Sequence, residues 1–414
     1  MPPVILAAIG CFMGGWDQSH TPSGIPYPIR EKNAMTDPSP SLSRQYEHSV
    51  PAFWPLALMA EMGEEGLEIF KRNLDFAEEI EKEELELKPV WATPNDILLD
   101  LNTLRLRDFS TPAARREKGL IPTLIVAPYA GHTSTIADYM PGQSLVETLQ
   151  AGGIRRVLCT DWKSATAEMK DFNIDIYLAE LNALIDDLSG VVNLVGLCQG
   201  GWMAAMYAAR YPDKVTTLVT AGTPLDADAG DGFIKKIAQD QPMSFFEELV
   251  TMGGGLMRGK FMLAGWKGMH PEEHYFKKYL ELYEHIEDPG YLKKNEEFER
   301  WYENPLDLPG RWYLQAIRQL FKDNRFCKGE FVALGRTIGL RDIACPTFLM
   351  AGKGDDITPY PQVFEADRKL STPKDKIVKK LVPGGHIGLF MGSRTLRDSW
   401  PSVAVWIRRE CPAA

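Results

Sequence analysis

The chain has 414 residues, and its 46 lysines and arginines against 56 aspartates and glutamates give a net charge of −10. This acidic balance, without a stripe rich in lysine or arginine, argues against nucleic acid as a partner. Hydrophobic residues make up 44% of the chain and charged residues 25%, which fits a globular protein with a sizeable core and excludes a largely disordered one.

The first fifty residues carry no pattern of a folded element. Residues 1–50 contain an apolar run at 4–13 and then a stretch rich in proline, serine and other polar residues. The run lacks a basic flank and, at about ten residues, is too short to span a bilayer. We therefore expect a mobile leader, no transmembrane segment and a cytoplasmic protein.

The next region, 51–118, is expected to be a helical N-terminal region, because apolar residues recur with helical spacing up to a proline at position 89. After position 122 the sequence pattern changes to short runs rich in β-branched residues, which alternate with stretches of helical periodicity. Continuous apolar strands separated by helices predict an α/β fold, a mostly parallel sheet with helices on both faces. The expected strands are 123–129, 155–162, 191–197 and 215–222, and the expected helices are 176–188 and 201–210.

Strand signals vanish over 226–340, where aromatic and charged helical sequence takes their place, and they return at 346–356 and 376–386. The expected core is therefore split into 119–225 and 341–414. The segment between the two parts reads as a large, mostly helical cap or lid over the carboxyl ends of the strands, where open α/β sheets bind ligands.

The sharpest motif is a cysteine between two glycines, Gly196-Leu197-Cys198-Gln199-Gly200, at the end of an apolar strand. It has the spacing of the nucleophile elbow GxSxG, with sulfur in place of oxygen. The glycines Gly196 and Gly200 are needed because the turn from strand to helix is tight. The elbow presents Cys198 at a helix N-terminus, which favours the thiolate.

Two further residues complete the order that the α/β-hydrolase fold requires: nucleophile, acid, histidine. Asp355 and His386 each follow one of the last predicted strands. We expect His386 to take the proton from Cys198 and Asp355 to hold the imidazole in the correct tautomer.

The oxyanion hole of this fold takes one backbone N–H from the residue after the nucleophile, here Gln199, and one from a loop after an early strand. That loop is 127–132 and contains Tyr129, Gly131 and His132. Two interpretations of His132 stay open: contact with substrate, or hydrogen bonding to loop backbone.

His270 and His274 have the HxxEH spacing of some zinc sites, but such a site needs a distant third ligand, and the Pro-Glu-Glu start is typical of an ordinary first helical turn. The six cysteines form no CxxC pair. We therefore predict no metal and no bound cofactor.

At these residues the chain resembles the polyhydroxyalkanoate enzymes, α/β-hydrolase-like proteins with a cysteine nucleophile. GLCQGG at 196–201 with the sequence up to Asp226, and PGGHIG around His386, resemble the polyester synthases, particularly the short ones that work with a partner subunit. APYAGHTST at 127–135, WYLQAIRQLF with CKGEF at 312–331 and GLFMGSR resemble the intracellular polyhydroxyalkanoate depolymerases.

The chain departs from each of the two groups at one position. In the synthases a histidine typically follows the catalytic aspartate, whereas this chain has Asp356, and the depolymerases usually lack the full GxCxG, which this chain completes with Gly200. The longer matched stretches and Asp356 favour the depolymerases. The resemblance therefore implies a depolymerase of poly-3-hydroxybutyrate that works through a Cys-His-Asp triad and an acyl-thioester. The alternative is a synthase that uses 3-hydroxyacyl-CoA. A second alternative is a non-catalytic granule-binding protein, docked through the apolar residues of the cap.

The resemblance also implies the surroundings of the reaction. The substrate would be a polyester granule or a 3-hydroxyacyl thioester, and the protein would lie in the cytoplasm or on such granules. Water or coenzyme A would be the acyl acceptor, so coenzyme A enters as a co-substrate. Assembly would be as a homodimer or with a partner subunit.

Overall fold

The structure is a computed structural model that describes residues 88–269, 285 and 288–414. The expected leader and the helical pattern before residue 88 lie outside the described residues. His270 and His274 lie outside them as well. The described residues all belong to one compact unit.

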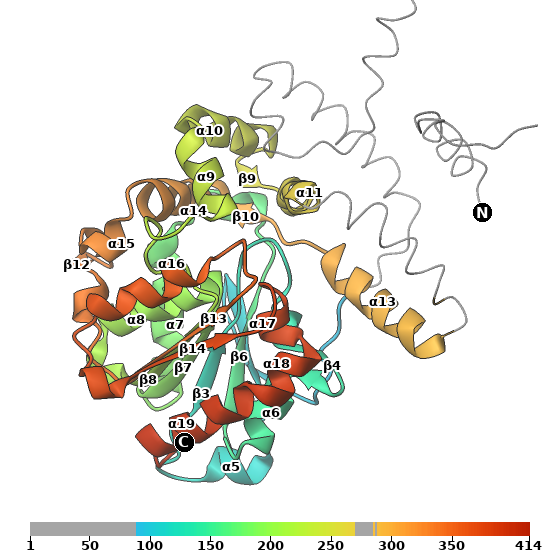
Figure 1. The fold of residues 1–414 in the computed structure, drawn as a ribbon, viewed down its shortest axis with the longest axis vertical. Coiled ribbons are helices and arrows are strands. Elements are labelled where there is room, and N and C mark those ends of the chain that lie inside the picture. Colours follow the sequence, from blue (N-terminus) through green and yellow to red (C-terminus); the bar gives the residue numbers. More distant parts are fainter. Residues whose placement is uncertain (1–87, 270–284, 286–287) are drawn as a thin grey trace, which may run out of the picture. The chain divides into compact units, whose positions relative to one another are not determined.

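An eight-stranded sheet forms the centre of this unit, with the strand order β1-β2-β6-β3-β7-β8-β13-β14 (Figure 1). The pairs β1–β2 and β2–β6 are antiparallel, and every other neighbouring pair is parallel. The predicted α/β-hydrolase-like sheet is therefore confirmed. Its strands are Asp96–Asp100, Leu104–Asp108, Val157–Trp162, Thr123–Val126, Val192–Leu197, Val215–Ala221, Thr347–Gly352 and Ile377–Val382.

The central strands are buried on both faces, which is why they are mostly apolar along their length and do not alternate between apolar and polar residues. Helices α7 (Ile174–Asp187) and α8 (Gln199–Arg210) pack on one face. Helices α6 (Leu145–Ala151) and α19 (Trp400–Glu410) lie on the other face (Figure 1).

Residues 96–108 correct part of the sequence analysis, which assigned 51–118 to a helical region. They form the antiparallel strands β1 and β2 at the edge of the sheet. In β2, leucines alternate with arginines and the leucines are buried, so the period is that of a strand. The acid-rich helical pattern that precedes it obscured this short signal.

The chain leaves the sheet after β8 and returns at β13, and the insert between them contains helices and short hairpins. Most of its helices gather at one end of the sheet, at the top of Figure 1, whereas the helix 289–302 lies to the side. Its elements are α9 Phe233–Asp240, α10 Met243–Met252, β9 Leu256–Met257, α11 Gly259–Met269, α13 Pro289–Tyr302, β10 Leu308–Pro309, α14 Gly310–Ala316, a π-helix Ile317–Lys322, α15 Arg325–Lys328, β11 Phe331–Ala333 and β12 Arg336–Ile338.

The remaining short elements flank the sheet. They are α5 Pro112–Arg116, β4 Asp138–Met140, β5 Gln143–Ser144, α16 Tyr360–Phe364, α17 Gly388–Met391 and α18 Ser393–Asp398. In the part of the chain that the structure describes, no helix has the length and apolar character to cross a membrane.

Candidate active site

Cys198 occupies a strained turn between β7 and α8. Its φ of 47° and ψ of −122° lie outside the regions that residues other than glycine ordinarily adopt. Its backbone N–H donates to the carbonyl of Ala221 at 2.8 Å, which ties the turn to the neighbouring strand. Strain of this kind persists where the surrounding structure enforces it, and it is common at functional sites.

The two glycines of the motif are required by close backbone approach. A Cβ on Gly200 would lie 2.2 Å from the carbonyl oxygen of Val126 and 2.4 Å from that of Ala127. A Cβ on Gly196 would lie 2.4 Å from Cα of Gly201. Helix α8 therefore starts directly against β3 only because these side chains are missing.

Replacing Gly200 with alanine is expected to destabilise the fold by about 1–3 kcal/mol or more, because backbone atoms of β3 or α8 must move. The midpoint of chemical denaturation measures the loss. Gly388→Ala is the matched control, since a Cβ there meets no atom within 4 Å. Equal midpoints for the two variants would contradict the packing argument.

His386 and Asp355 lie on the loops that follow β14 and β13. Nδ1 of His386 donates to Oδ2 of Asp355 at 2.8 Å. The other carboxylate oxygen, Oδ1, accepts backbone N–H groups of Ile357 at 3.1 Å and Thr358 at 2.8 Å. The other side of the His386 ring interacts electrostatically with Cys198. The structure thus brings together the three residues that the sequence analysis selected.

The charge state of His386 follows from these neighbours. Burial alone lowers the pKa of His386, but its electrostatic interactions with Cys198 and Asp355 outweigh burial and raise this pKa to about 10. A histidine placed between a thiol and a carboxylate can take the proton of the thiol, so that the sulfur attacks a carbonyl carbon, and can then protonate a leaving group.

The loop after β3 lies beside the cysteine, but its groups are already engaged. The backbone N–H of Tyr129 donates to Oε1 of Gln199. The Tyr129 hydroxyl donates to the carbonyls of Lys163 and Asp307, at 3.0 and 3.1 Å. The N–H of Tyr129 therefore reaches the site only through the Gln199 side chain. The backbone N–H of Gln199 makes no hydrogen bond to any described residue.

Gly131 and His132 face the insert, and neither lines the cavity beside Cys198. Gly131 has a φ of 99°, and its carbonyl accepts the N–H of Leu306 at 2.8 Å. The His132 ring stacks on Trp301 and Tyr302, with centroids 4.6 and 5.0 Å apart, and its Nε2 donates to the Tyr302 carbonyl. Of the two interpretations of His132, the geometry favours backbone hydrogen bonding.

Burial lowers the pKa of His132 to about 4, so the ring is neutral in the folded protein. The unfolded chain binds a proton near pH 6.5, and stability should therefore fall as the pH drops from 6.5 towards 4. Between pH 7 and pH 5 the free energy of unfolding should fall in the wild type by about 2 kcal/mol more than in His132→Phe, which has no imidazole to protonate. Urea denaturation at both pH values measures this, and an unchanged pH dependence would contradict it.

A cavity of about 170 Å³ lies beside Cys198, and residues of the insert close much of it. It is smaller than the roughly 300–1,000 Å³ of typical ligand pockets, so it suits a short acyl group. Its lining contains no charged side chain. It comprises Tyr129, Ala130, Cys198, Gln199, Trp202, Pro224, Phe233, Ile234, Ile237, Ala238, Phe245, Phe246, Leu249, Met257, Met262, Gly265, Trp266, Leu308, Trp312, Tyr313, Ala316, Ile317, Phe321, Ile357 and Thr358.

Several of these residues were missed as site residues by the sequence analysis. Trp202 lies three residues after Gln199 on α8, and Trp312 of α14 stacks on it with centroids 5.5 Å apart. The Trp202 position could have been found, because a residue one turn along α8 from the elbow stays close to it. Nothing in the sequence indicates that the insert brings Trp312 back to the same place.

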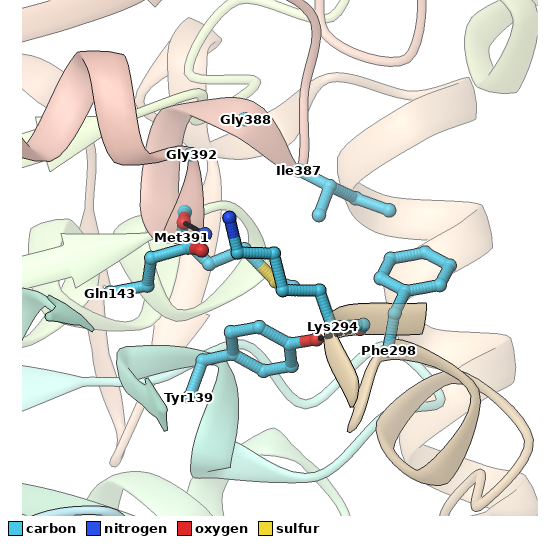
Figure 2. A pocket seen from close by; sticks show the side chains of 8 residues that line it. All are labelled: Tyr139, Gln143, Lys294, Phe298, Ile387, Gly388, Met391 and Gly392. Carbon is cyan, nitrogen blue, oxygen red and sulfur yellow. Dashed lines mark hydrogen bonds between the residues drawn. The ribbon is translucent and has the colours of Figure 1, made fainter. Parts of the chain in front are cut away.

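A second, open cavity of about 280 Å³ lies on the far side of the histidine loop, between α13 and α17. Figure 2 shows Tyr139, Gln143 and Lys294 around it. The Tyr139 hydroxyl donates to the Lys294 carbonyl at 3.2 Å, and Nε2 of Gln143 donates to the Met391 carbonyl at 3.0 Å. The first bond ties α13 to β4, and the second ties β5 to α17.

The family described as "Protein of unknown function (DUF3141)" matches residues 81–400, which is most of the chain and includes the cysteine, the aspartate and the histidine. The chain belongs to this family.

Relatives of this DUF3141 member include a "Poly(3-hydroxyalkanoate) polymerase subunit PhaC" of Haloferax mediterranei, 28% identical over 77% of this chain. The chain spans 64% of that relative's length. A polymerase subunit of the same name from Allochromatium vinosum is 27% identical over 76% of this chain and 88% of its own. The DUF3141 chain is thus related to polyhydroxyalkanoate enzymes of the α/β-hydrolase type.

A solved structure, the monoacylglycerol lipase of Paleococcus ferrophilus, matches 75% of this chain and 100% of its own, with 16% identity and a TM-score of 0.47.

Proposed function

We propose that this protein is an acyltransferase that works in the direction of polymerisation. Cys198 would accept the acyl group of a 3-hydroxyacyl thioester and pass it on to form a polyester. The observation that carries the proposal is the interacting series Cys198, His386 and Asp355 at the edge of an uncharged cavity. The names of the relatives favour the polymerase over the depolymerase that the sequence analysis placed first.

The proposed mechanism has two transfers through one thioester. The Cys198 thiolate attacks the carbonyl carbon of a 3-hydroxyacyl thioester, and the His386 imidazolium protonates the departing thiol, which in this direction is coenzyme A. The neutral imidazole then takes the proton from the 3-hydroxyl of another acyl group. The resulting alkoxide attacks the acyl-Cys198 carbonyl, which forms the ester and releases the thiolate.

Stabilisation of the oxyanion would come from the backbone N–H of Gln199 at the start of α8. Donors placed where negative charge develops contribute much of the rate in such sites. Asp355 does not touch the reacting atoms in this scheme. Its role is to keep Nδ1 of His386 protonated, so that Nε2 faces the sulfur.

The depolymerase remains the second candidate, and Asp356 is the observation that favours it. This exposed carboxylate stands where the synthases typically have a histidine that is thought to assist activation of the hydroxyl. In the depolymerase direction, water or coenzyme A would release the acyl group from Cys198. In either direction the protein would act in the cytoplasm or on polyester granules.

The buried state of the insert argues against the third candidate, a non-catalytic granule-binding protein. None of the apolar cap residues expected to dock on polyester is exposed. Phe246, Leu256, Met257, Phe261 and Leu263 are buried, and Phe245, Met252, Met262 and Trp266 are partly buried. Several of the same residues line the Cys198 cavity instead.

Incubation of the purified full chain with 3-hydroxybutyryl-CoA, and separately with amorphous polyester granules, tests the direction. The proposal predicts free coenzyme A and insoluble polyester in the first assay, with a partner subunit added if the chain alone is slow. Soluble 3-hydroxyacid from granules, with no consumption of the thioester, would overturn it in favour of the depolymerase. Inactivity in both assays would favour the granule-binding candidate.

A further inference from the structure

The Cys198 cavity contains an unusual set of buried hydrogen-bond donors. Nε2 of Gln199 and the indole Nε1 atoms of Trp202, Trp266 and Trp312 are all buried and have no hydrogen-bond partner among the described residues. All four residues line this one cavity. A buried donor without a partner destabilises a fold by roughly 1–3 kcal/mol. Four such donors beside one cavity therefore suggest that a ligand accepts from them.

The orientation of the Gln199 amide is determined by its neighbour. Because the Tyr129 N–H can only donate, the atom that it meets must be the amide oxygen, and the amide nitrogen is left without a partner. Gln199 is 6% exposed, so bulk water does not reach this group freely. Two amide hydrogens therefore remain for a ligand in the cavity.

The indole donors come from both parts of the fold. Trp202 belongs to α8 of the core, whereas Trp312 and Trp266 belong to α14 and α11 of the insert. The rings of Trp202 and Trp312 are stacked at 26°, and each residue is 3% exposed. Because stacked rings present their faces to one another, neither N–H can be satisfied by the partner ring.

The remainder of the lining restricts the ligand further. No aspartate, glutamate, lysine or arginine lines the cavity, so a charged ligand would lose its hydration without compensation. A purely hydrocarbon chain would leave all four donors unsatisfied. The matching ligand is uncharged and apolar, and carries several oxygen atoms that accept hydrogen bonds.

From this match we infer that the Cys198 cavity binds an ester-bearing acyl chain, whose carbonyl and ester oxygens accept from Gln199, Trp202, Trp266 and Trp312. The inference rests on the proposed function for the acylation of Cys198 and goes beyond it in naming the acyl group that the cavity selects. The acyl group carried by Cys198 would already contain an ester. Side chains of both the insert and the core would determine the specificity for it.

Two p-nitrophenyl esters of the same shape test this selection. The acyl group of one is 3-acetoxybutyrate, and that of the other is its hydrocarbon isostere 3,5-dimethylhexanoate. Release of p-nitrophenolate gives kcat/KM for each, corrected for the rate of the same ester with hydroxide. We expect the wild type to prefer the ester-bearing group by about tenfold or more, the effect of one or two hydrogen bonds.

Variants then assign the preference to the donors. Trp312→Phe and Trp202→Phe remove an N–H while keeping an aromatic ring, and Gln199→Glu keeps an acceptor for the Tyr129 N–H but removes the amide donor. Each should lower the preference several-fold. Trp406→Phe is the matched control, because its indole nitrogen is also buried without a partner but does not line the cavity, and it should keep the wild-type preference.

Two outcomes would overturn the inference: no preference in the wild type, or a preference that survives in all three donor variants. Failure of the proposed function is distinguishable, because p-nitrophenolate release would then be as fast in Cys198→Ala as in the wild type. If one donor variant fails to fold, the other two still decide, since each removes a different donor.

Discussion

Cys198→Ala should lose turnover of any acyl substrate by a factor on the order of 10⁴ or more, while keeping the fold. The loss is large because the sulfur forms the covalent intermediate in both directions of the proposed reaction, and residual catalysis without a nucleophile is weak. The fold should survive because alanine fills less space than cysteine at the tip of the turn. Initial rates with 3-hydroxybutyryl-CoA measure the loss of turnover, and a circular dichroism spectrum shows whether the fold is kept.

Cys345→Ala provides the control for loss of a thiol as such. Cys345 lies before β13, and burial raises the pKa of its thiol to about 12, so it is not a competing nucleophile. This variant should turn over substrate at the wild-type rate. Wild-type-like rates in Cys198→Ala would refute the assignment of the nucleophile.

Asp355→Asn is expected to lower kcat by roughly 10³–10⁴-fold through the tautomer of His386. The backbone N–H groups of Ile357 and Thr358 hold one side-chain oxygen at position 355, so an asparagine must place its oxygen there. Its amide nitrogen then faces Nδ1 of His386, which must become an acceptor. The proton moves to Nε2, and the imidazole can no longer accept a proton from a hydroxyl.

The rate of alkylation of Cys198 separates this account from a loss of structure. Asp355→Asn should keep a wild-type denaturation midpoint, while His386 with its proton on Nε2 can no longer take the proton of Cys198, so that alkylation of Cys198 by iodoacetamide slows at pH 7. Asp375→Asn, the same change at an exposed position, should alter neither rate. An unchanged alkylation rate in Asp355→Asn would contradict the proposed role of the carboxylate.

Much of the fold was predictable because the central strands carry their own signal. β7 and β13 are buried along their whole length, so their sequences are mostly apolar, with Asn193 and Thr347 as the polar exceptions. The edge strands β1 and β2 were missed because they are short and half-exposed, and their alternating leucines and charges follow a strongly helical pattern.

Part of the candidate site was predictable from the sequence, and part was not. Cys198, Asp355 and His386 were selected because each follows a recognisable strand, and strand ends in a parallel sheet converge on one edge. The cavity was not predictable, since its wall combines Trp202 with Trp312 and Trp266 from the insert. Contacts between residues so far apart in sequence depend on how the insert folds back, and no local pattern encodes that path.

The loop after β3 links the insert to the chemistry. Its Tyr129 hydroxyl, Gly131 carbonyl and His132 ring all bond to residues 302–307 of the insert, while its Tyr129 N–H holds the side chain next to the nucleophile. An outward swing of the insert, wide enough to admit a bulky chain, would pull on this loop and release the Gln199 amide. Admission of a chain and binding of its oxygens by the Gln199 amide would then exclude one another, so the loop after β3 would couple the position of the insert to the grip of the cavity on its acyl group.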